Sequence, residues 1–451
     1  MFNHLASIFL AGTVMEILWL LSYSLSPLRS HSGSFVALML MLFGICLWTY
    51  LRCPVNSSRK LALVLGFALI FRLSLLPAPP DQSEDVYRYL WDGRLSALGM
   101  DPYQYPPDAK ELESYRDQQI YPMLNSKQHI TAYPPLSQGI FHLSYRLFGA
   151  AVIPMKAIFS LLEFSALLLA WRLLHAFGAG RQTLLLMAWN PFFIFEFSHS
   201  GHSDSSMIFL ILLSVLLMHR SRKIWAAVCY AGAILAKLHP ALWLPLYLRR
   251  LGWKADAAGL SILALCVPLF FTSETWLPYL KSLRLYYKLF EFNAGIHYLL
   301  RFIGHTFFEQ SWDKLTGPYL GAALVLITGL IAWRFPVRDA RSLLHAGFWI
   351  MTADLCLATT VHPWYISWAA LALPFFPYAF MMYWTGASFL SYLAYGFHPV
   401  HEPAWVLLVE YLPLYALMGW EIYRGAPWLQ PRFARVHEDR RKRNIHTTSH
   451  P

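Results

Sequence analysis

Carboxylates and arginines are concentrated in and just before the segment SEDVYRYLWDGR, residues 83–94. Asp81, Glu84 and Asp85 lie close together in the sequence, and Arg88 follows three residues after Asp85. A carboxylate in such a setting can act as a general base, and a nearby cation can hold a phosphate. We therefore predict that the general base is one of Asp81, Glu84 and Asp85, and that Arg88 contacts substrate. In the alternative interpretation Asp85 caps a helix and Arg88 forms a structural ion pair.

A second set of polar side chains interrupts the apolar segments farther along the chain. His202 and Asp204 in FSHSGHSD could bond a substrate or support the base, although simple loop polarity would also explain them. Glu196 lies near the end of an apolar run, where a charge is costly without a partner. We expect these side chains to meet at one surface, and the candidate substrate-binding residues are Arg88, Glu196, His202, Asp204, Lys237, His239, Arg301 and His362.

Several familiar catalytic motifs are missing from the chain. It contains no Walker loop, GxGxxG, HExxH or GxSxG, so nucleotide binding, zinc hydrolysis and ordinary serine chemistry have no support. Its cysteines show neither a CxxC pair nor zinc-ligand spacing. We identify no cofactor and no metal-ligand set, while the paired acids leave a divalent metal ion as an open alternative.

The polar residues must be positioned by membrane-spanning helices. Apolar residues make up 57% of the 451-residue chain and charged residues only 14%, against roughly 25% charged residues in soluble domains. A spanning helix needs about 20 apolar residues, and such runs recur along the chain. We predict an all-α polytopic membrane protein with about 12–13 transmembrane helices, near 5–28, 33–51, 61–77, 152–174, 183–198, 205–218, 224–248, 255–272, 317–333, 343–361, 363–380, 383–398 and 403–423.

One predicted span, 224–248, contains polar residues and prolines in its middle, namely Lys237, His239, Pro240 and Pro245. We predict that it forms two half-helices, because such residues free backbone groups that must be satisfied again. With that break and an inside N-terminus, the basic loops fall on one side of the membrane. The positive-inside rule assigns that side to the cytoplasm.

We expect one transmembrane domain, residues 1–423, followed by a basic cytoplasmic tail, 424–451. Two long external loops, about 78–151 and 273–316, lie on the opposite side and carry short helices at the membrane interface. The tail accounts for much of the net charge of +11 and suits anionic lipid, so no nucleic-acid partner is predicted. The expected location is therefore a membrane, with the site on the side opposite the cytoplasm.

Three further acids, Glu16, Glu163 and Asp354, lie inside apolar segments. We expect each to be buried against an arginine such as Arg72, because an unpaired charge in a bilayer is costly. This interpretation makes them structural rather than catalytic.

Several motifs together resemble a known enzyme family. SEDVYRYLWDGRLSALGMDPYQYPP is similar to the first external loop of bacterial GT-C glycosyltransferases that use a polyprenyl-phosphate sugar. The most similar members are mannosyltransferase-like and are distantly similar to the catalytic subunit of GPI mannosyltransferase I. The remaining matches follow in the same order, with AYPPLSQ at 132–138, WNPFFIFEFSHSGHSDS at 189–205, LAKLHPALWLP at 235–245, FNAGIHYLLR at 292–301 and HPWYISW at 362–368.

The resemblance implies the GT-C fold and direct transfer of a sugar, with mannose favoured. It also implies a bacterial inner (plasma) membrane, with the site on the periplasmic or extracellular side. The lipid donor would lie between helices, and an external-loop carboxylate, with Asp85 favoured, would deprotonate the acceptor hydroxyl. Attack opposite the phosphate would invert the anomeric carbon, and cationic groups would hold the departing polyprenyl phosphate. The implied partners are the donor, the bilayer and a glycan, lipid or protein acceptor, and the candidate cations are Lys237, His239, Arg301 and His362.

The resemblance leaves the base and the function partly open. The acidic pair here is Glu84–Asp85 rather than Asp-x-Asp, so the choice among Asp81, Glu84 and Asp85 stays open. A secondary transporter could use intramembrane acids and a broken helix, but transporters often have paired repeats with matching breaks, and only one break is evident here. A transferase of the same fold could instead carry aminoarabinose or glucose.

Overall fold

The computed structural model describes residues 4–288, 290–397 and 399–429. Most of the basic tail predicted for 424–451 therefore lies outside the described residues. The longer helices are α1 (His4–Leu21), α2 (Ser32–Arg52), α3 (Ser58–Leu75), α4 (Asp85–Ala97), α5 (Pro135–Phe148), α6 (Val152–Ala176), α9 (Asp204–His219), α10 (Lys223–Ala236), α12 (Trp253–Phe270), α13 (Ser273–Lys288), α14 (Gly295–Phe308), α15 (Asp313–Arg334), α16 (Ala340–Leu357) and α19 (Ala404–Arg424).

Short helical segments connect these longer ones. The short α-helices are α7 (Leu185–Ala188), α8 (Pro191–Ile194), α11 (Leu244–Leu248), α17 (Ser367–Ala370) and α18 (Ala379–Ala387). A π-helical turn spans Phe195–His199. The 3-10 turns are Ser22–Leu25, Leu28–His31, Lys110–Tyr115, Tyr121–Met123, Arg181–Leu184, His239–Trp243, Pro363–Ile366 and Ser388–Gly396.

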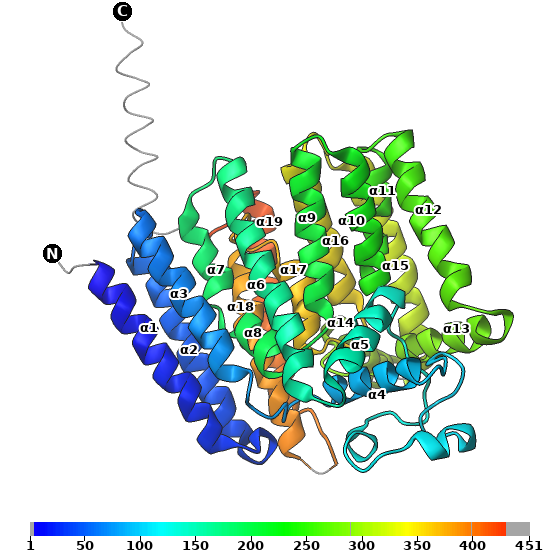
Figure 1. Cartoon of the computed structure of the whole chain (residues 1–451). Helices are drawn as coiled ribbons and strands as arrows, with labels where there is room; N and C mark the ends of the chain where they lie inside the picture. The colour runs from blue at the N-terminus through cyan, green and yellow to red at the C-terminus, as the bar shows by residue number, and fades with distance from the viewer. Residues whose placement is uncertain (1–3, 289, 398, 430–451) are drawn as a thin grey trace, which may run out of the picture.

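The chain is an all-α membrane protein, as predicted. Apart from one isolated parallel bridge between Phe292 and Thr360, the described residues contain no β-structure. Figure 1 shows the long helices running side by side. The total number of spans stays a prediction, but within the described part of the chain five segments are long and apolar enough to cross a membrane, namely His4–Leu25, Leu28–Arg52, Val152–Ala176, Leu315–Arg334 and Ala404–Arg424.

The predicted break within 224–248 is confirmed. α10 ends at Ala236, and after an extended Lys237 the chain forms the turn from His239 before α11 begins. Pro240 lies in the first positions of that turn. A proline fits there because it has no N–H to donate within a helix.

Our expectation of a single break was wrong. The segment 183–198 contains α7, α8 and the start of the π-helical turn instead of one helix. The segment 363–380 begins with the 3-10 turn at Pro363 and the short α17. Pro191 and Pro363 each begin a new helical segment, because the first turn of a helix does not use the N–H that proline lacks. Interrupted helices at membrane depth commonly line a cavity.

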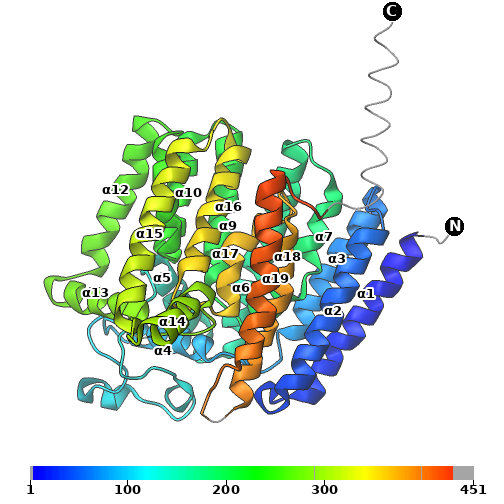
Figure 2. The ribbon, with the colours of Figure 1, turned by 180° about the vertical axis from the view of Figure 1, so that it is seen from behind.

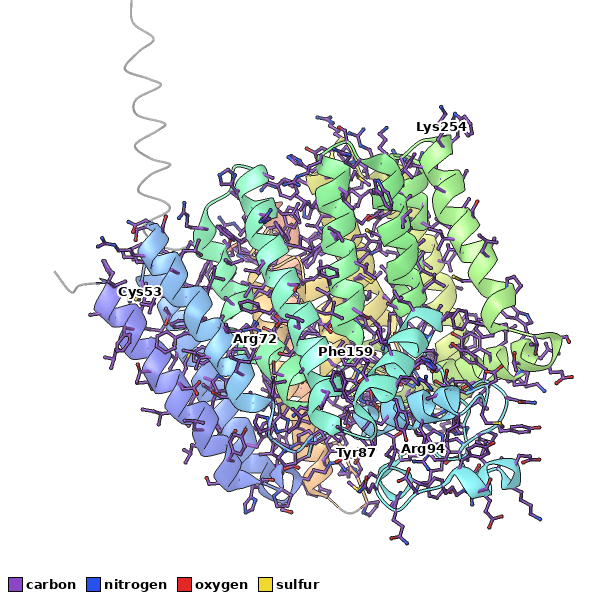
Figure 3. The ribbon with its side chains drawn as sticks, viewed as in Figure 1. Cys53, Arg72, Tyr87, Arg94, Phe159 and Lys254 are labelled. Atoms are coloured by element: carbon purple, nitrogen blue, oxygen red, sulfur yellow. The ribbon has the colours of Figure 1, made fainter. Side chains whose placement is uncertain are left out.

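The two ends of the bundle have different structures. The loops that carry the predicted basic clusters lie at the upper end in Figure 1, where α1 begins and α19 ends. α4, α13 and α14 lie at the lower end, and α4 and α13 run across the long helices (Figures 1 and 2). Figure 3 places Lys254 at the upper end and Tyr87 and Arg94 at the lower end. The segments predicted as external loops therefore share one end.

α4 is held in place by close packing against α5. Tyr89 stacks on Phe141 with ring centroids 4.5 Å apart. A Cβ atom at Gly93 would lie 2.4 Å from the Phe141 carbonyl oxygen, so this approach requires glycine. The packing fixes the direction in which the first turn of α4 presents its side chains.

Glu163, one of the three intramembrane acids, is paired with Arg72 as predicted. Arg72 Nε lies 2.5 Å from Glu163 Oε2, and Nη2 lies 2.8 Å from Oε1. Both side chains are buried, and the bidentate geometry suits an arginine–carboxylate pair away from water.

The other two intramembrane acids have different partners, so the prediction of an arginine partner was wrong for them. Glu16 accepts a hydrogen bond from Ser74 Oγ at 2.5 Å. Asp354 contacts His239, which the broken segment brings to α16. One arginine cannot serve three acids, and both Arg72 terminal nitrogens already donate hydrogen bonds.

Candidate active site

Asp85 is a candidate base that keeps part of its carboxylate accessible. It is the first residue of α4, and its side chain is 20% exposed. In the described part of the chain no side-chain hydrogen bond caps α4, so the capping interpretation of Asp85 has no support. Its ion-pair partner is His202, whose Nδ1 lies 3.6 Å from Asp85 Oδ2. The carboxylate is therefore oriented by the protein without being enclosed by it.

The other two candidate acids face the loop between α1 and α2. Asp81 accepts a hydrogen bond from the backbone N–H of Leu28 at 3.1 Å. Glu84 pairs with Arg29 at 2.5 Å. Both carboxylates thus bind the first external loop to the loop between α1 and α2. Asp85 is the candidate acid that pairs with His202.

His202 is fully buried between two carboxylates. Its Nε2 lies 3.4 Å from Glu196 Oε2, while its Nδ1 faces Asp85. Both distances exceed those of good hydrogen bonds, so His202 is held between the two carboxylates by a long contact on each side. Burial alone would lower the pKa of His202, but its interactions with Asp85 and Glu196 outweigh burial and raise that pKa to about 9. His202 is therefore an imidazolium at neutral pH.

Glu196 is presented to His202 by the π-helical turn. Such turns are rare and frequently occur at functional sites. Glu196 Oε1 accepts a hydrogen bond from Tyr392 at 2.8 Å, and its Oε2 faces His202. Because the side chain is fully buried, the geometry favours an effect through His202 over direct contact with substrate.

The surrounding charges keep Asp85 ionised. Burial by itself would raise the pKa of Asp85, but the interaction with His202 and the positive charge of Lys237 hold it below its ordinary value. An ionised carboxylate with an accessible side is the form that can accept a proton.

Lys237 and Asp204 form a second ion pair next to this group. Lys237 Nζ lies 3.1 Å from Asp204 Oδ1, and the Trp368 indole N–H donates to the same oxygen at 2.6 Å. The ammonium also lies 5.3 Å from the ring centroid of Tyr365 and 5.6 Å from that of Trp368, within cation–π range. Both carboxylate oxygens of the buried Asp204 thus have a partner, while 14% of the Lys237 side chain is exposed.

Lys237 and His239 line a cavity of about 160 Å³. Tyr133 and Asp354 add to its polar wall, whereas α15 and α16 contribute an apolar wall that includes Leu320, Leu324 and Leu357. A cavity with one charged wall and one aliphatic wall suits an amphiphilic ligand.

A stack of rings connects the second external loop to His202. His202 stacks on Trp364 at 3.9 Å between ring centroids, and Trp364 stacks on His362 at 4.5 Å. Phe292 continues the stack at 4.9 Å from His362, and its carbonyl accepts the Val361 N–H at 2.7 Å. Burial lowers the pKa of His362 to about 4, so this ring is neutral and offers hydrogen bonding instead of charge.

The two candidate arginines pair with other acids. Arg88 Nε lies 2.9 Å from Asp92 Oδ1, one helical turn farther along α4, which matches the structural interpretation of Arg88. Arg301 pairs with Glu291 inside the second external loop. Neither ion pair includes a residue of the His202 group.

No metal site is evident among the residues described. Within those ranges, no group of three or more His, Cys, Asp or Glu side chains is placed to hold a metal ion. The charges of the site are instead matched by protein partners, and the divalent-ion alternative stays a prediction.

Sequence reasoning missed Trp364, Trp368 and Asp354 as members of the site. The two tryptophans were visible in HPWYISW, where only His362 was singled out. They stand four residues apart, the spacing that places side chains on one helical face, so an aromatic wall could have been predicted. Asp354 carries no local signal, because its partner is more than 100 residues away.

Comparison with known proteins identifies the family of this chain. Residues 4–251, more than half of the chain, match a family model described as "Alpha-(1->6)-mannopyranosyltransferase, N-terminal domain". The matched part includes Asp85, His202 and Lys237. No curated protein and no solved structure shows significant similarity. The chain therefore belongs to the alpha-(1->6)-mannopyranosyltransferase family and is a membrane glycosyltransferase of the mannosyltransferase class.

Proposed function

We propose that this enzyme transfers mannose from a polyprenyl-phosphate donor to a hydroxyl acceptor, with a GT-C architecture and inversion of the anomeric carbon. One observation carries the proposal, namely that the accessible carboxylate of Asp85 lies in a cationic group that borders an amphiphilic cavity. Lys237 links the two, because it lines the cavity and its charge acts on Asp85. A donor with a charged head and an apolar tail matches the two walls of the cavity.

In this proposal Asp85 is the general base. It takes the proton of the acceptor hydroxyl while the acceptor oxygen forms a bond to the anomeric carbon. The bond from that carbon to the phosphate oxygen breaks on the opposite face, and the electron pair leaves with the phosphate. Lys237 and His239 stabilise the developing negative charge. His202 keeps Asp85 ionised and oriented before the acceptor binds.

We assign the reaction to the non-cytosolic face of a bacterial inner membrane. The loops with basic clusters lie at the opposite end of the bundle from α4 (Figure 1), and basic loops face the cytoplasm in membrane proteins. The polyprenyl tail would then remain against the leucines of α15 and α16, and the sugar would meet the acceptor at the external loops.

The other candidate functions are less well supported. A secondary transporter is not favoured, because the family to which the chain belongs is enzymatic. Donors that carry glucose or aminoarabinose instead of mannose are compared directly in the experiment below.

The test uses the full-length protein purified in detergent, synthetic polyprenyl-phosphate sugars and an α-(1→6)-linked mannoside as acceptor. We expect the mannose donor to yield free polyprenyl phosphate and an extended acceptor. The anomeric carbon of the transferred mannose should have the configuration opposite to that in the donor. Asp85→Asn should lower kcat by roughly 1,000-fold, within the range of general-base contributions, because an amide cannot take the acceptor proton.

Glu113→Gln is the matched control, since it makes the same chemical change at an exposed position of the first external loop. This variant should keep the wild-type rate. Full activity in a well-folded Asp85→Asn variant would remove Asp85 from the mechanism. A wild-type enzyme that releases polyprenyl phosphate from none of the donors would overturn the proposed donor class.

A further inference from the structure

The cavity holds a buried carboxylate, Asp354, to which the reaction described above gives no role. Asp354 on α16 places Oδ2 2.9 Å from His239 Nδ1, and both residues line the cavity. The Asp354 side chain is 8% exposed, whereas that of His239 is 23% exposed. An ionised carboxylate this deep in a membrane helix is costly unless a partner group stabilises its charge.

The contact determines which nitrogen of His239 is available to a ligand. An ionised carboxylate can only accept hydrogen bonds, so His239 Nδ1 must donate to Asp354. Nε2 is then the nitrogen left for the cavity. The ring is also held against Trp368, with centroids 3.8 Å apart and the ring planes tilted by 31°. A carboxylate that orients an imidazole and stabilises its protonated form is the arrangement used in hydrolytic triads.

Lys237 and His239 have different partners in the cavity. Lys237 is paired with Asp204 and contacts both of its carboxylate oxygens, whereas His239 is paired with Asp354. The titratable groups that face His239 or share its cavity are Asp354 on α16, Lys237 on its own segment, Asp204 on α9, Tyr133 from the first external loop and Tyr365 beside Trp368.

We propose that His239 is a catalytic residue that protonates the departing phosphate through Nε2, and that Asp354 is the residue that positions it. The proposal rests on the proposed function. As the acceptor oxygen bonds to the anomeric carbon, the carbon–oxygen bond to the phosphate breaks and the phosphate gains a second negative charge. The imidazolium proton moves to a phosphate oxygen, while the acceptor proton moves to Asp85. Both side chains are partly exposed, so Asp85 returns its proton to water and His239 recovers one.

The experiment compares Asp354→Asn and His239→Gln with wild type in the full-length protein, using polyprenyl-phosphate mannose across a range of pH. Protonated His239 is required, so the rate should fall as pH rises. In Asp354→Asn this fall should begin at lower pH, and kcat should drop by on the order of 100-fold, the low end for general-acid contributions, with a smaller change in KM. In His239→Gln the rate should be low and this part of the pH dependence absent.

Asp339→Asn provides the matched control on the same helix. Asp339 caps α16 outside the cavity, and asparagine caps helices equally well, so this variant should keep the wild-type rate and pH profile. Should Asp354→Asn fail to fold, the His239→Gln profile alone decides. An unchanged pH profile in the folded variants, whatever the loss of rate, would reduce the pair to a structural contact and overturn the inference.

Binding of polyprenyl phosphate alone separates this inference from the proposed function. Its affinity for wild type and each variant is measured by quenching of tryptophan fluorescence. If wild type neither binds polyprenyl phosphate nor uses the mannose donor, the proposed donor class fails. If wild type does both, but the variants keep its pH dependence, only the assignment of His239 and Asp354 fails.

Discussion

Asp85, His202 and Glu196 form a row of alternating charges in the site. Tyr392 ends the row by donating a hydrogen bond to Glu196. An imidazolium between two carboxylates is tolerated in a buried position because every charge has a partner, and removal of one partner leaves a costly unpaired charge. The row therefore orients Asp85 and leaves part of its carboxylate accessible.

Glu196→Gln should change how the stability of the protein depends on pH. The pKa of His202 is raised to about 9 in the folded protein, above its ordinary value of about 6.5. Protonated His202 thus contributes stability that is complete below the ordinary value and is lost as pH rises through about 9. In Glu196→Gln this contribution should be smaller and be lost at lower pH, which thermal melting at a series of pH values would show.

The control for this measurement is Glu111→Gln, which makes the same change at an exposed position of the first external loop. It should melt with the wild-type pH dependence. If Glu196→Gln lowered the melting temperature by the same amount at every pH, its effect would be one of packing, and the charge row would not explain the role of Glu196.

At the scale of secondary structure elements, the contact between α4 and α5 determines where Asp85 points. The Tyr89–Phe141 stack and the close approach at Gly93 hold the two helices together. The broken segments have a related role, because the turns that begin at His239 and Pro363 bring side chains to the cavity that a continuous helix would place elsewhere.

Gly93→Ala should disturb both stability and activity. The added Cβ would lie 2.4 Å from the Phe141 carbonyl oxygen, a backbone atom that cannot rotate away, so α4 must shift against α5. Overpacking of this kind costs about 1–3 kcal/mol, and a displacement of about 1 Å in a catalytic group can cost roughly 100-fold in rate. Thermal melting and the mannose transfer assay measure the two effects.

Gly139→Ala is the matched control within α5. A Cβ at Gly139 would have no neighbour within 4 Å, and alanine in a helix is favoured over glycine, so this variant should be as stable and active as wild type. Equal behaviour of the two variants would show that the α4–α5 approach does not position Asp85.

At the scale of the whole molecule, the site contains residues from before and after residue 251, where the family match ends. The family-matched residues 4–251 contribute Asp85, His202 and Lys237, and later segments contribute Trp364 and Asp354. The buried apolar core is equally continuous and extends from α1 to α19. α19 packs mainly against α18 and the turn Ser388–Gly396, and Figure 2 shows α19 beside α18. The site thus requires the assembled bundle.

Cysteine labelling tests which end of the bundle faces outward. Lys110→Cys places a thiol in the first external loop, and Lys254→Cys places one at the opposite end (Figure 3), both at exposed positions. We expect a membrane-impermeant maleimide to label Lys110→Cys in intact spheroplasts and Lys254→Cys only after permeabilisation. The parent protein gives the background from the native thiols. The reverse pattern would place Asp85 on the cytoplasmic side.

Several features of this protein follow from composition and local pattern alone. Long apolar runs predict membrane helices because backbone groups in lipid must be satisfied within the helix. Pro240 and Lys237 predict the break because neither suits the middle of an apolar helix. The motif SEDVYRYLWDGR indicates a candidate acidic site from its local pattern, because it groups carboxylates and arginines soon after an apolar run.

Only the tertiary structure decided which of these residues act together. Asp81, Glu84 and Asp85 are chemically alike in the sequence, and they differ because two of them contact the α1–α2 loop while the third contacts His202. Asp354 was expected to meet an arginine and instead meets His239. Such pairings depend on distances between segments far apart in the chain, and a local pattern of side chains carries no information about those distances.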